Sequence, residues 1–293
     1  MPVTCPFSSV DYLRGLSNIG EVDKHPDLPY AVLRRKINGD SNFDGVGPWP
    51  YRWITKEADI GIFTEGFRHL VSLSVVTQPG WKPSSSLAAK ADIRKLKEHF
   101  VFDPKKPTPE LSKRARKRLR DAGKCGYFET VNELCKKLEI VDYYEQLKIR
   151  RNLTDSFFDM PRSHFESISK LPGSVFFRVS DSIGVGAMAC AVVIDDFLQV
   201  LHIVPTENGL TWNASYLMMY GLQRYVREKG LLLLTGGMPD NGSKGLIVFK
   251  SRWANTFLPV YMLCIVNSQD TVNILVANNN FHSNYFPPYR YAK

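Results

Sequence analysis

The pattern of hydrophobic and polar positions divides the chain into a strand-rich beginning, a helical middle and a mixed second half. The first 80 residues contain aromatic and β-branched runs such as PYAVLRRKI and HLVSLSVVT, separated by turn-forming stretches such as NGD and QPG. This pattern predicts strands and turns. Between 78 and 109 the composition shifts to Pro, Ser and Lys, as in DPKKPTPE. We therefore expect a domain boundary near that segment.

The segment 108–123, TPELSKRARKRLRDAG, has the clearest helix signals in the chain. Thr108 is a suitable N-cap, Pro109 suits the first helical position, and Gly123 can end the helix. The apolar positions form one narrow stripe, made of Leu111, Ala115, Leu119 and Ala122. A stripe of that width predicts a helix that packs along one side and leaves its other sides to polar groups.

The second half alternates strands with helices. After helices over 131–152 and 162–172, the pattern predicts strands at 174–180, 183–194 and 197–204, then a helix that starts at Asn213 or Ser215 and ends at Gly230. A buried strand at 231–237, a short helix at 245–255 and closing strands at 260–267 and 271–277 complete it. This order predicts an α+β layered fold in which the long helix crosses over between two strands.

Charge and length narrow the possible partners. A chain of 293 residues favours two domains, and its formal net charge of +9 favours an anionic partner such as nucleic acid, nucleotide or phosphate. Most residues between 113 and 120 are cationic: Lys113, Arg114, Arg116, Lys117, Arg118 and Arg120. Like charges four residues apart on a helix repel each other, so this density predicts contact with an anion or nucleic acid. An ordinary solvated face is the alternative.

Cysteine and histidine give no sign of a disulfide framework, a metal site or a catalytic triad. The five cysteines are scattered without a CxxC spacing, and the six histidines form no HxH or HxxxH pair. His202 lies within an apolar strand and is expected to be a hydrogen-bonded core or cleft residue rather than a base. The N-terminus lacks a signal peptide pattern, and the apolar run 185–204 is interrupted by Asp195-Asp196, which predicts a hairpin turn. We expect a cytoplasmic monomer without a membrane span.

A lysine interrupts the apolar stretch 245–255, GLIVFKSRWAN. On a helix Leu246, Phe249 and Trp253 share one face, Lys250 projects beside them, and Arg252 points away. Lys250 therefore starts next to apolar surface. Its methylene stem can cover that surface while the ammonium reaches water, or the ammonium can be held at the wall of a binding site.

Three segments of the second half resemble one family. LSKRARKRLRDAGKCGYFETV is similar to the basic helix that leads into the second domain of the FemABX aminoacyl-tRNA-dependent peptidyltransferases, a group with the GNAT acyltransferase fold. WNASYLMMYGLQRYVREKGLLLLTGG resembles their long helix ending in Lys-Gly and their strand ending in Gly-Gly, and GLIVFKSRWAN resembles their Phe-Lys segment. The order and spacing match from about Leu111 to Val266.

The resemblance implies two tandem GNAT-like domains, a degenerate one over 1–110 and a transferase domain over 111–277, with the tail 278–293 returning to the first. It implies that Lys250 lies where donor and acceptor meet and steadies the tetrahedral oxyanion, while Phe249 positions it. Arg150 or Arg151, with Trp253 and Tyr216, is the expected substrate-binding set, and the basic helix is the expected tRNA-binding surface. Leu234-Thr235 replaces a frequent Tyr-Asp, which puts the usual cell-wall precursor in doubt as the acceptor.

The resemblance implies aminoacyl-tRNA as co-substrate, an amine of a peptide or peptidyl-nucleotide as acceptor, and no further cofactor. A CoA-dependent enzyme of this fold needs a glycine-rich turn before the long helix. That place is occupied by PTENGLTWNASY, which has one glycine, Gly209, and no basic residue. A transferase using acyl-CoA or a carrier protein is the first alternative, and a non-catalytic RNA-binding module is the second.

Overall fold

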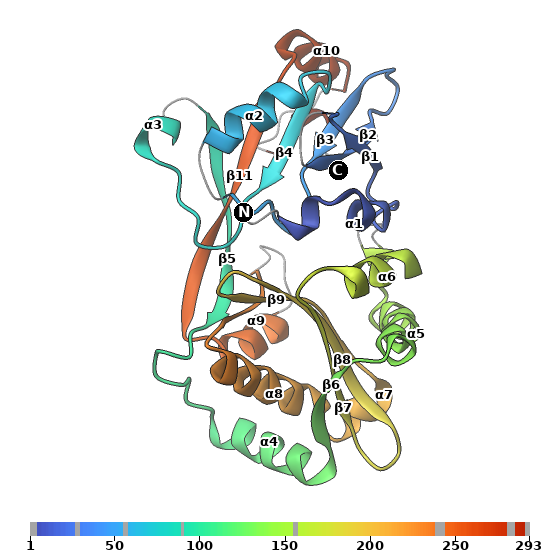
Figure 1. Cartoon of the computed structure of the whole chain (residues 1–293), viewed down its shortest axis with the longest axis vertical. Helices are drawn as coiled ribbons and strands as arrows, with labels where there is room; N and C mark the ends of the chain where they lie inside the picture. The colour runs from blue at the N-terminus through green and yellow to red at the C-terminus, as the bar shows by residue number, and fades with distance from the viewer. Residues whose placement is uncertain are drawn as a thin grey trace. The chain divides into compact units, whose positions relative to one another are not determined.

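The computed structural model describes residues 5–26, 30–54, 58–88, 91–154, 158–237, 244–279 and 285–290. By its contacts the chain forms two compact units (Figure 1). Unit 1 comprises Met1–Lys97 and Pro259–Lys293, and unit 2 comprises Glu98–Leu258. The second unit contains the residues that the sequence singles out for chemistry.

Unit 2 is built on a sheet whose strands run antiparallel except for one pair. β6 (Tyr127–Val131), β7 (Ser174–Ser180), β8 (Val185–Ile194) and β9 (Phe197–Pro205) pair antiparallel in chain order. β10 (Leu232–Gly237) pairs parallel to β9, and the end of β5 (Asp92–Phe102) pairs antiparallel to β10. Parallel neighbours need a crossover connection. Here it consists of α7 (Glu207–Thr211) and α8 (Ala214–Lys229).

Helices cover both faces of this sheet. α8 packs on β6, β7 and β8, and α4 (Lys113–Cys125) packs on α8. α5 (Leu134–Arg151) and α6 (Arg162–Lys170) cover the opposite face, where they contact β9 and β7 (Figure 1). α9 (Lys244–Ser251) follows β10. Unit 2 therefore has the α/β/α layers that the alternation of strand and helix patterns predicts.

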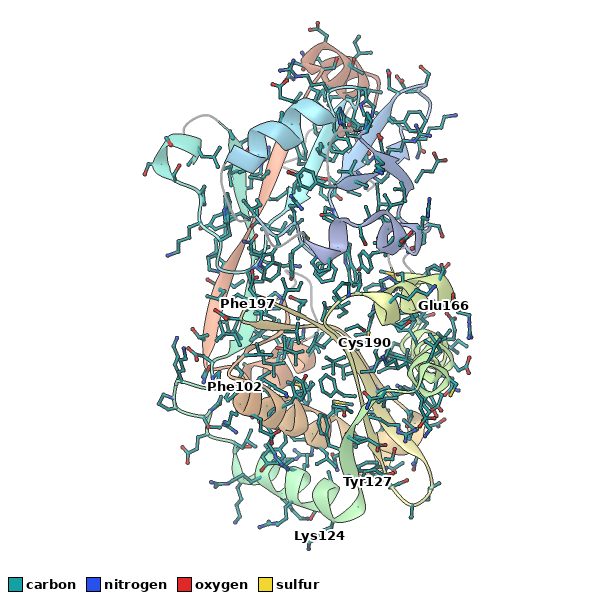
Figure 2. The ribbon with its side chains drawn as sticks, viewed as in Figure 1. Phe102, Lys124, Tyr127, Glu166, Cys190 and Phe197 are labelled. Carbon is teal, nitrogen blue, oxygen red and sulfur yellow. The ribbon has the colours of Figure 1, made fainter. Side chains whose placement is uncertain are left out.

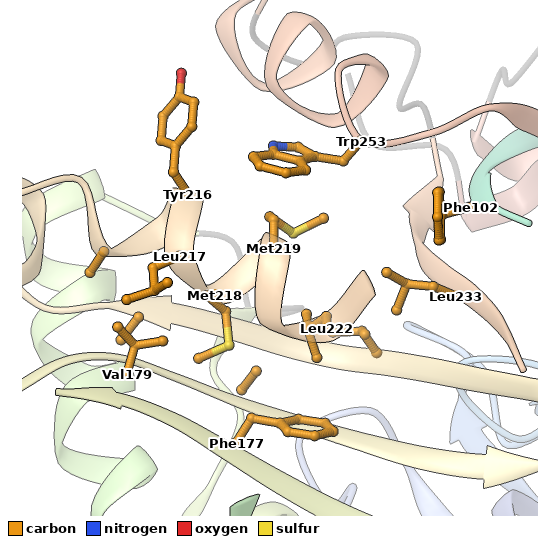
Figure 3. Close-up of a cluster of buried hydrophobic side chains, with 14 of the residues drawn as sticks. Phe102, Phe177, Val179, Tyr216, Leu217, Met218, Met219, Leu222, Leu233 and Trp253 are labelled. Carbon is orange, nitrogen blue, oxygen red and sulfur yellow. The ribbon is translucent and has the colours of Figure 1, made fainter. Parts of the chain in front are cut away.

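The core of unit 2 lies between α8 and the sheet. Met218 and Leu222 of α8 point toward Phe177 and Val179 of β7 (Figure 3). Alternate residues of β8 beneath the helix are buried alanines, namely Ala187, Ala189 and Ala191. Small side chains let the helix approach the strands closely, and burial of each large apolar side chain contributes roughly 1.5–3 kcal/mol. This packing fixes α8 on the sheet.

Unit 1 repeats the strand order of unit 2. β1 (Glu21–Lys24), β2 (Ala31–Lys36) and β3 (Phe43–Val46) pair antiparallel, and β4 (Ser72–Val76) pairs parallel to β3 after a connection that includes α2 (Ala58–Gly66). β11 (Thr256–Val266) then pairs antiparallel to β4. Each unit thus has an antiparallel meander, a crossover, a parallel pair and a closing strand. The predicted fold class, α+β with tandem GNAT-like domains, is confirmed.

The closing strand of each unit comes from a distant part of the chain. The end of β5 closes unit 2, and β11 closes unit 1. The contacts therefore divide the chain after Lys97 and Leu258, rather than after the expected positions 110 and 277. The composition shift at 78–109 does not mark the boundary, because β5 lies within this segment. Strand pairing decides which unit a strand belongs to. β5 and β11 each run from one unit into the other.

Residues 285–290 lie within unit 1. Tyr289 in the 3-10 turn η3 (Pro288–Arg290) shares a hydrogen bond with Ser72 on β4, with oxygen atoms 2.6 Å apart. Arg290 bonds the buried carboxylate of Asp44, which also accepts from Arg35 at 3.0 Å. A buried carboxylate needs such paired donors to offset the loss of water. These bonds hold this part of the tail against β2, β3 and β4.

The boundaries of α4 differ from those predicted. The helix begins at Lys113, because Ser112 is its N-cap and accepts a hydrogen bond from the Ala115 amide at 3.3 Å. Thr108 instead accepts from the Arg227 side chain on α8. Gly123 lies inside the helix, which ends at Cys125. Thr108-Pro109 was a valid start signal by itself, but Ser112 satisfies the same rule at the position that the structure uses.

The predicted strand at 271–277 is wrong, because these residues belong to α10 (Gln269–Asn279). β-branched residues suggested a strand. The buried side chains of Val272 and Leu275, with the partly buried Val276, follow helical spacing, and they pack with Ile37 and Val71 of unit 1. Packing of an apolar face outweighs the weak strand preference of single residues. The hairpin turn at Asp195-Asp196 is confirmed, with Asp195 at φ 48°.

A pair of histidines joins α6 to the sheet. The Nε2 atoms of His164 on α6 and His202 on β9 lie 3.0 Å apart, next to Tyr144 of α5, whose ring centre is 5.3 Å from that of His202. Burial lowers the pKa of His202 to about 4, and burial together with the neighbouring His202 lowers the pKa of His164 well below its usual value. Both rings are therefore neutral at pH 7. His202 is hydrogen-bonded to a neighbouring side chain, as expected.

This pair predicts a pH-dependent stability. Because both pKa values lie below the usual 6.5, the unfolded chain binds more protons than the folded protein below that pH. The contribution to the free energy of unfolding is complete above pH 6.5 and decreases as pH falls toward about 4. Urea unfolding at pH 7.0 and at pH 5.0 measures this difference. His202→Gln, which keeps a hydrogen-bonding side chain without titrating, should show a smaller difference between the two pH values; an equal difference would contradict the assignment.

Candidate active site

Lys250 is held against the end of β10. It lies near the end of α9, is partly buried, and donates a hydrogen bond from Nζ to the carbonyl oxygen of Gly237 at 3.2 Å. Gly236 has φ +99°, and a Cβ placed there would lie 2.6 Å from the ammonium nitrogen. The strand end therefore gives room to the lysine only because it lacks side chains. The ammonium contacts backbone, and it is more constrained than a solvated surface cation.

The ladder between β9 and β10 is short. The two strands pair only over Leu232–Leu234 and Phe197–Gln199, whereas β9 continues to Pro205 and β10 to Gly237. Next to this point β9 has an extra residue, Leu201, relative to β8. Such bulges re-aim the backbone and are frequent beside active sites. Beyond the bulge, backbone groups of β9 and β10 do not pair with each other, so they can bind an extended ligand.

Three aromatic rings position α9 on α8. The ring of Tyr216 meets those of Phe249 and Trp253 edge to face, with centres 5.5 and 5.9 Å apart, and Phe249 lies 6.3 Å from Trp253. Figure 3 shows Tyr216 and Trp253 on the side of α8 away from the strands. Trp253 is only 2% exposed, so it supports the site from the core rather than forming its surface. Phe249 precedes Lys250 on the same helix and fixes its orientation.

Two arginines converge on Tyr216. Arg252 donates from Nη1 to the hydroxyl oxygen at 3.0 Å, and Arg118 on α4 donates from Nη1 to the same oxygen at 3.2 Å. The expectation that Arg252 points away is wrong, because α9 ends at Ser251 and the next residue leaves the helical spacing. Sequence reasoning missed Arg252 for this reason. The six predicted cations of α4 thus include one, Arg118, that turns inward.

The other cations of α4 form its outer surface. The exposed side chains are those of Lys113, Arg114, Arg116, Lys117 and Arg120. Arg116 has an ion pair at 4.0 Å with Glu110, itself exposed; such a pair is weak. Lys124 extends the same positive surface at the outer end of the helix (Figure 2). We call these six exposed residues of α4 the basic ridge. It is joined to Lys250 through Arg118, Tyr216 and Phe249.

Arg150 and Arg151 lie elsewhere. Both are at the end of α5, which packs on the opposite face of the sheet from α8. Arg150 donates from Nη2 to the Pro205 carbonyl at the end of β9, at 2.7 Å, and Arg151 is exposed. Among the hydrogen bonds and ion pairs of the described residues, neither joins the cluster around Tyr216. Their role in binding substrate stays a prediction.

The connection from β9 to α8 is closely packed. A Cβ on Gly209 would lie 1.7 Å from the carbonyl oxygen of Gly186, and a Cβ on Gly186 would lie 2.2 Å from the ring of Trp212. Thr206 caps α7 by accepting from the Gly209 amide at 3.0 Å. The single glycine in this connection thus serves close contact between α7 and β8. It is not part of a glycine-rich turn that presents successive amides to a phosphate.

No metal centre is formed by the part of the chain that the structure describes. No group of three or more His, Cys, Asp or Glu side chains there can hold an ion, and all five cysteines are free. None of the described helices has both the length and the apolar character needed to cross a membrane.

Comparison with solved structures identifies the fold. The chain matches the crystal structure of FemX with a TM-score of 0.65 at 11% identity, over 93% of this chain and 95% of FemX. It matches the C-terminal domain of a putative lysylphosphatidylglycerol synthetase from Agrobacterium fabrum with a TM-score of 0.59 at 12% identity, over 92% and 95% of the two chains. L-PGS from Bacillus licheniformis gives a TM-score of 0.58 at 11% identity, over 92% and 91%.

By sequence alone, no protein-family model and no curated protein matches the chain. At 11–12% identity the structural matches establish the fold, and they extend over nearly the whole chain, including both units. The likeness to FemX agrees with the resemblance read from the three sequence segments. It confirms the predicted fold and leaves the role of each site residue to be argued from the geometry.

Gly236 offers a test of how Lys250 is held. Gly236→Ala should lower the free energy of unfolding by about 1–3 kcal/mol, because φ +99° disfavours alanine and the new Cβ must displace the ammonium. The matched control is Gly123→Ala within α4, where nothing lies within 4 Å of the added Cβ. That variant should be stabilised by up to about 1 kcal/mol. Chemical denaturation of both variants measures the difference, and equal effects would refute the described contact.

Proposed function

We propose that this protein is a transferase that moves an aminoacyl group from aminoacyl-tRNA to an amine of a peptide or peptide-like acceptor. One observation carries the proposal: the ammonium of Lys250, held against Gly237 at the point where β9 and β10 stop pairing, is linked through Tyr216 to the basic ridge. A reaction centre and a surface for an anionic donor thus occur in one unit.

The chemistry matches the groups at hand. An aminoacyl ester is already activated, so transfer requires attack by a neutral amine on the ester carbonyl carbon. The tetrahedral intermediate has a negative oxygen, and its collapse expels the ribose oxygen, which takes up the proton lost by the amine. Catalysis therefore mainly requires that the substrates are oriented and that the oxyanion is stabilised. A fixed ammonium stabilises the oxyanion, and the unpaired edges of β9 and β10 offer backbone groups that orient a substrate.

Two observations favour tRNA over acyl-CoA as donor. The exposed cations of α4 form a surface large enough for several phosphates, and they lie on the helix that also provides Arg118. The connection before α8 is packed against Gly186 and has no basic residue, which disfavours binding of a pyrophosphate there. A transferase using acyl-CoA or a carrier protein is the alternative, and a non-catalytic RNA-binding module is the second.

The structural neighbours support aminoacyl transfer as a class. FemX is one of them, and another is described as a lysylphosphatidylglycerol synthetase, a name whose product contains an aminoacyl group. The change from Tyr-Asp to Leu234-Thr235 before Gly236 disfavours the usual cell-wall precursor. The acceptor in the proposal is therefore defined by its chemistry, a primary amine on a peptide or peptidyl-nucleotide.

Lys250→Met tests the catalytic role. The substitution keeps the apolar stem and removes the charge, so turnover should fall by about 10²-fold or more, as loss of one oxyanion partner does. Stability should change by only about 1 kcal/mol, the typical worth of the lost bond to Gly237. The measurement is transfer of a labelled amino acid from charged tRNA to a panel of amine acceptors, with unfolding followed in parallel.

Lys244→Met is the matched control, since Lys244 begins the same helix and is exposed. It should retain full turnover. Arg252 is unsuitable as a control because it bonds Tyr216. Full activity of Lys250→Met would remove the lysine from the mechanism, and activity with acyl-CoA in the absence of RNA would select the alternative donor.

Charge reversal on α4 tests the donor surface. Replacing Arg116, Lys117 and Arg120 with Glu should weaken binding of tRNA and reduce the slope of log affinity against log salt by about 3, roughly one for each lost phosphate contact. The control replaces three exposed lysines on other segments of unit 2, Lys105, Lys170 and Lys229, with Glu. Both variants change the net charge equally. Equal slopes in the two variants would indicate attraction by net charge only.

A further inference from the structure

Two hydrogen-bond donors meet the hydroxyl of Tyr216. Its hydroxyl oxygen accepts from both Arg118 and Arg252, so its own hydrogen must point to another group. Within the described residues no hydrogen bond from that hydroxyl to a protein acceptor exists. The indole Nε1 of Trp253 is buried and also has no partner among them, and Figure 3 shows the nitrogen edge of this ring on the side of Tyr216.

The two guanidinium groups also have no counter-charge. Neither Arg118 nor Arg252 has a carboxylate oxygen within 4.0 Å in the described part of the chain, although Arg178, Arg162 and Arg224 of the same unit do. Two cations that share one acceptor repel each other, and both are partly buried, where repulsion is stronger than in water. Each arginine has five N–H donors and uses one of them to bond Tyr216. The remaining donors suit an oxyanion with several acceptor oxygens.

This cluster lies between the basic ridge and Lys250. Arg118 comes from the helix that bears the ridge, and Arg252 follows Lys250 by two residues. Phe249, which precedes Lys250, packs on the ring of Tyr216 at 5.5 Å. A strand of nucleic acid bound along α4 with its end at Lys250 would lie beside this cluster, and its last phosphates would be the anions near the two arginines.

We propose that Arg118, Arg252 and Tyr216 form a binding site for a phosphodiester near the 3′ end of the donor RNA. The proposal rests on the function proposed above and names the contact that fixes the donor ester at Lys250. The two guanidinium groups bind the phosphate oxygens from two sides. The Tyr216 hydroxyl makes the third contact by donating its hydrogen to a phosphate oxygen. Arginine suits this role because its planar fork matches phosphate geometry.

The test uses binding rather than turnover, so that it is independent of the acceptor. The probe is an RNA hairpin that carries no amino acid and has a single-stranded 3′ end. It is compared with versions in which one of the last three phosphodiester linkages is replaced by an electrically neutral methylphosphonate. Arg118→Met and Arg252→Met should each weaken binding of the native hairpin about tenfold, the usual worth of a charge-assisted hydrogen bond. One methylphosphonate should weaken binding to the wild-type protein to a similar extent.

Coupling decides the assignment. In either arginine variant the same methylphosphonate should cause less than a twofold further loss, because its partner is already gone. Arg118→Lys and Arg252→Lys, which keep the charge but lose the fork, should recover only part of the affinity. Arg224→Met, an exposed arginine of α8 paired with Glu228 at 3.5 Å, should bind all probes like the wild type.

The proposal would be overturned if, at every linkage, the methylphosphonate weakened binding as much in the arginine variants as in the wild type. It would also be overturned if the variants bound normally while their free energy of unfolding fell, since the arginines would then only support the fold. Loss of binding to CoA rather than to RNA in these variants would equally overturn it. If coupling is found but no aminoacyl transfer occurs, the phosphate site stands and the catalytic proposal fails. If transfer occurs without coupling, the catalytic proposal stands and the site fails.

Discussion

The parallel pairing of β9 with β10, only three residue pairs long, is the constraint on which the rest of unit 2 depends. Parallel strands cannot be joined by a tight turn, so a crossover helix is required, and α8 fills this role. Its inner side packs on the alanines of β8, and its outer side carries Tyr216. Because the pairing stops early, the end of β10 is left to contact Lys250 rather than β9.

The distribution of charge follows a second constraint. A helix with six cations between 113 and 120 is disfavoured by repulsion among its own side chains. Folding relieves little of this, since five of the six stay exposed and the sixth, Arg118, is brought beside another arginine. The polyanionic donor that we propose would account for both features at once, whereas an ordinary solvated helix accounts only for the exposed residues.

The sequence alone predicts the layered fold of unit 2 well, because the strands at 174–204 and the helix at 213–230 have strong periodic patterns with clear turn residues. The proximity of Phe249 to Lys250 and Trp253 also follows from local spacing. The placement of β5 and β11 does not, because it depends on pairing between strands that are more than 130 residues apart in the chain. The contact of Arg252 with Tyr216 could not be predicted either, because it depends on α9 ending at Ser251, directly before Arg252.

The choice of cation at each position is consistent with a division of roles. Lysine presents a compact point charge that can follow a single developing oxyanion, and the ammonium of Lys250 lies beside the backbone of Gly236 and Gly237 at a strand end. Arginine presents a planar fork that suits an anion with several oxygens, and two arginines occur where the aromatic cluster meets the basic ridge. Tyr216 connects the two regions, since it bonds both arginines through its hydroxyl and packs on Phe249 through its ring. An anion bound at the two arginines, as proposed, would therefore lie next to the same tyrosine that packs on the helix of Lys250.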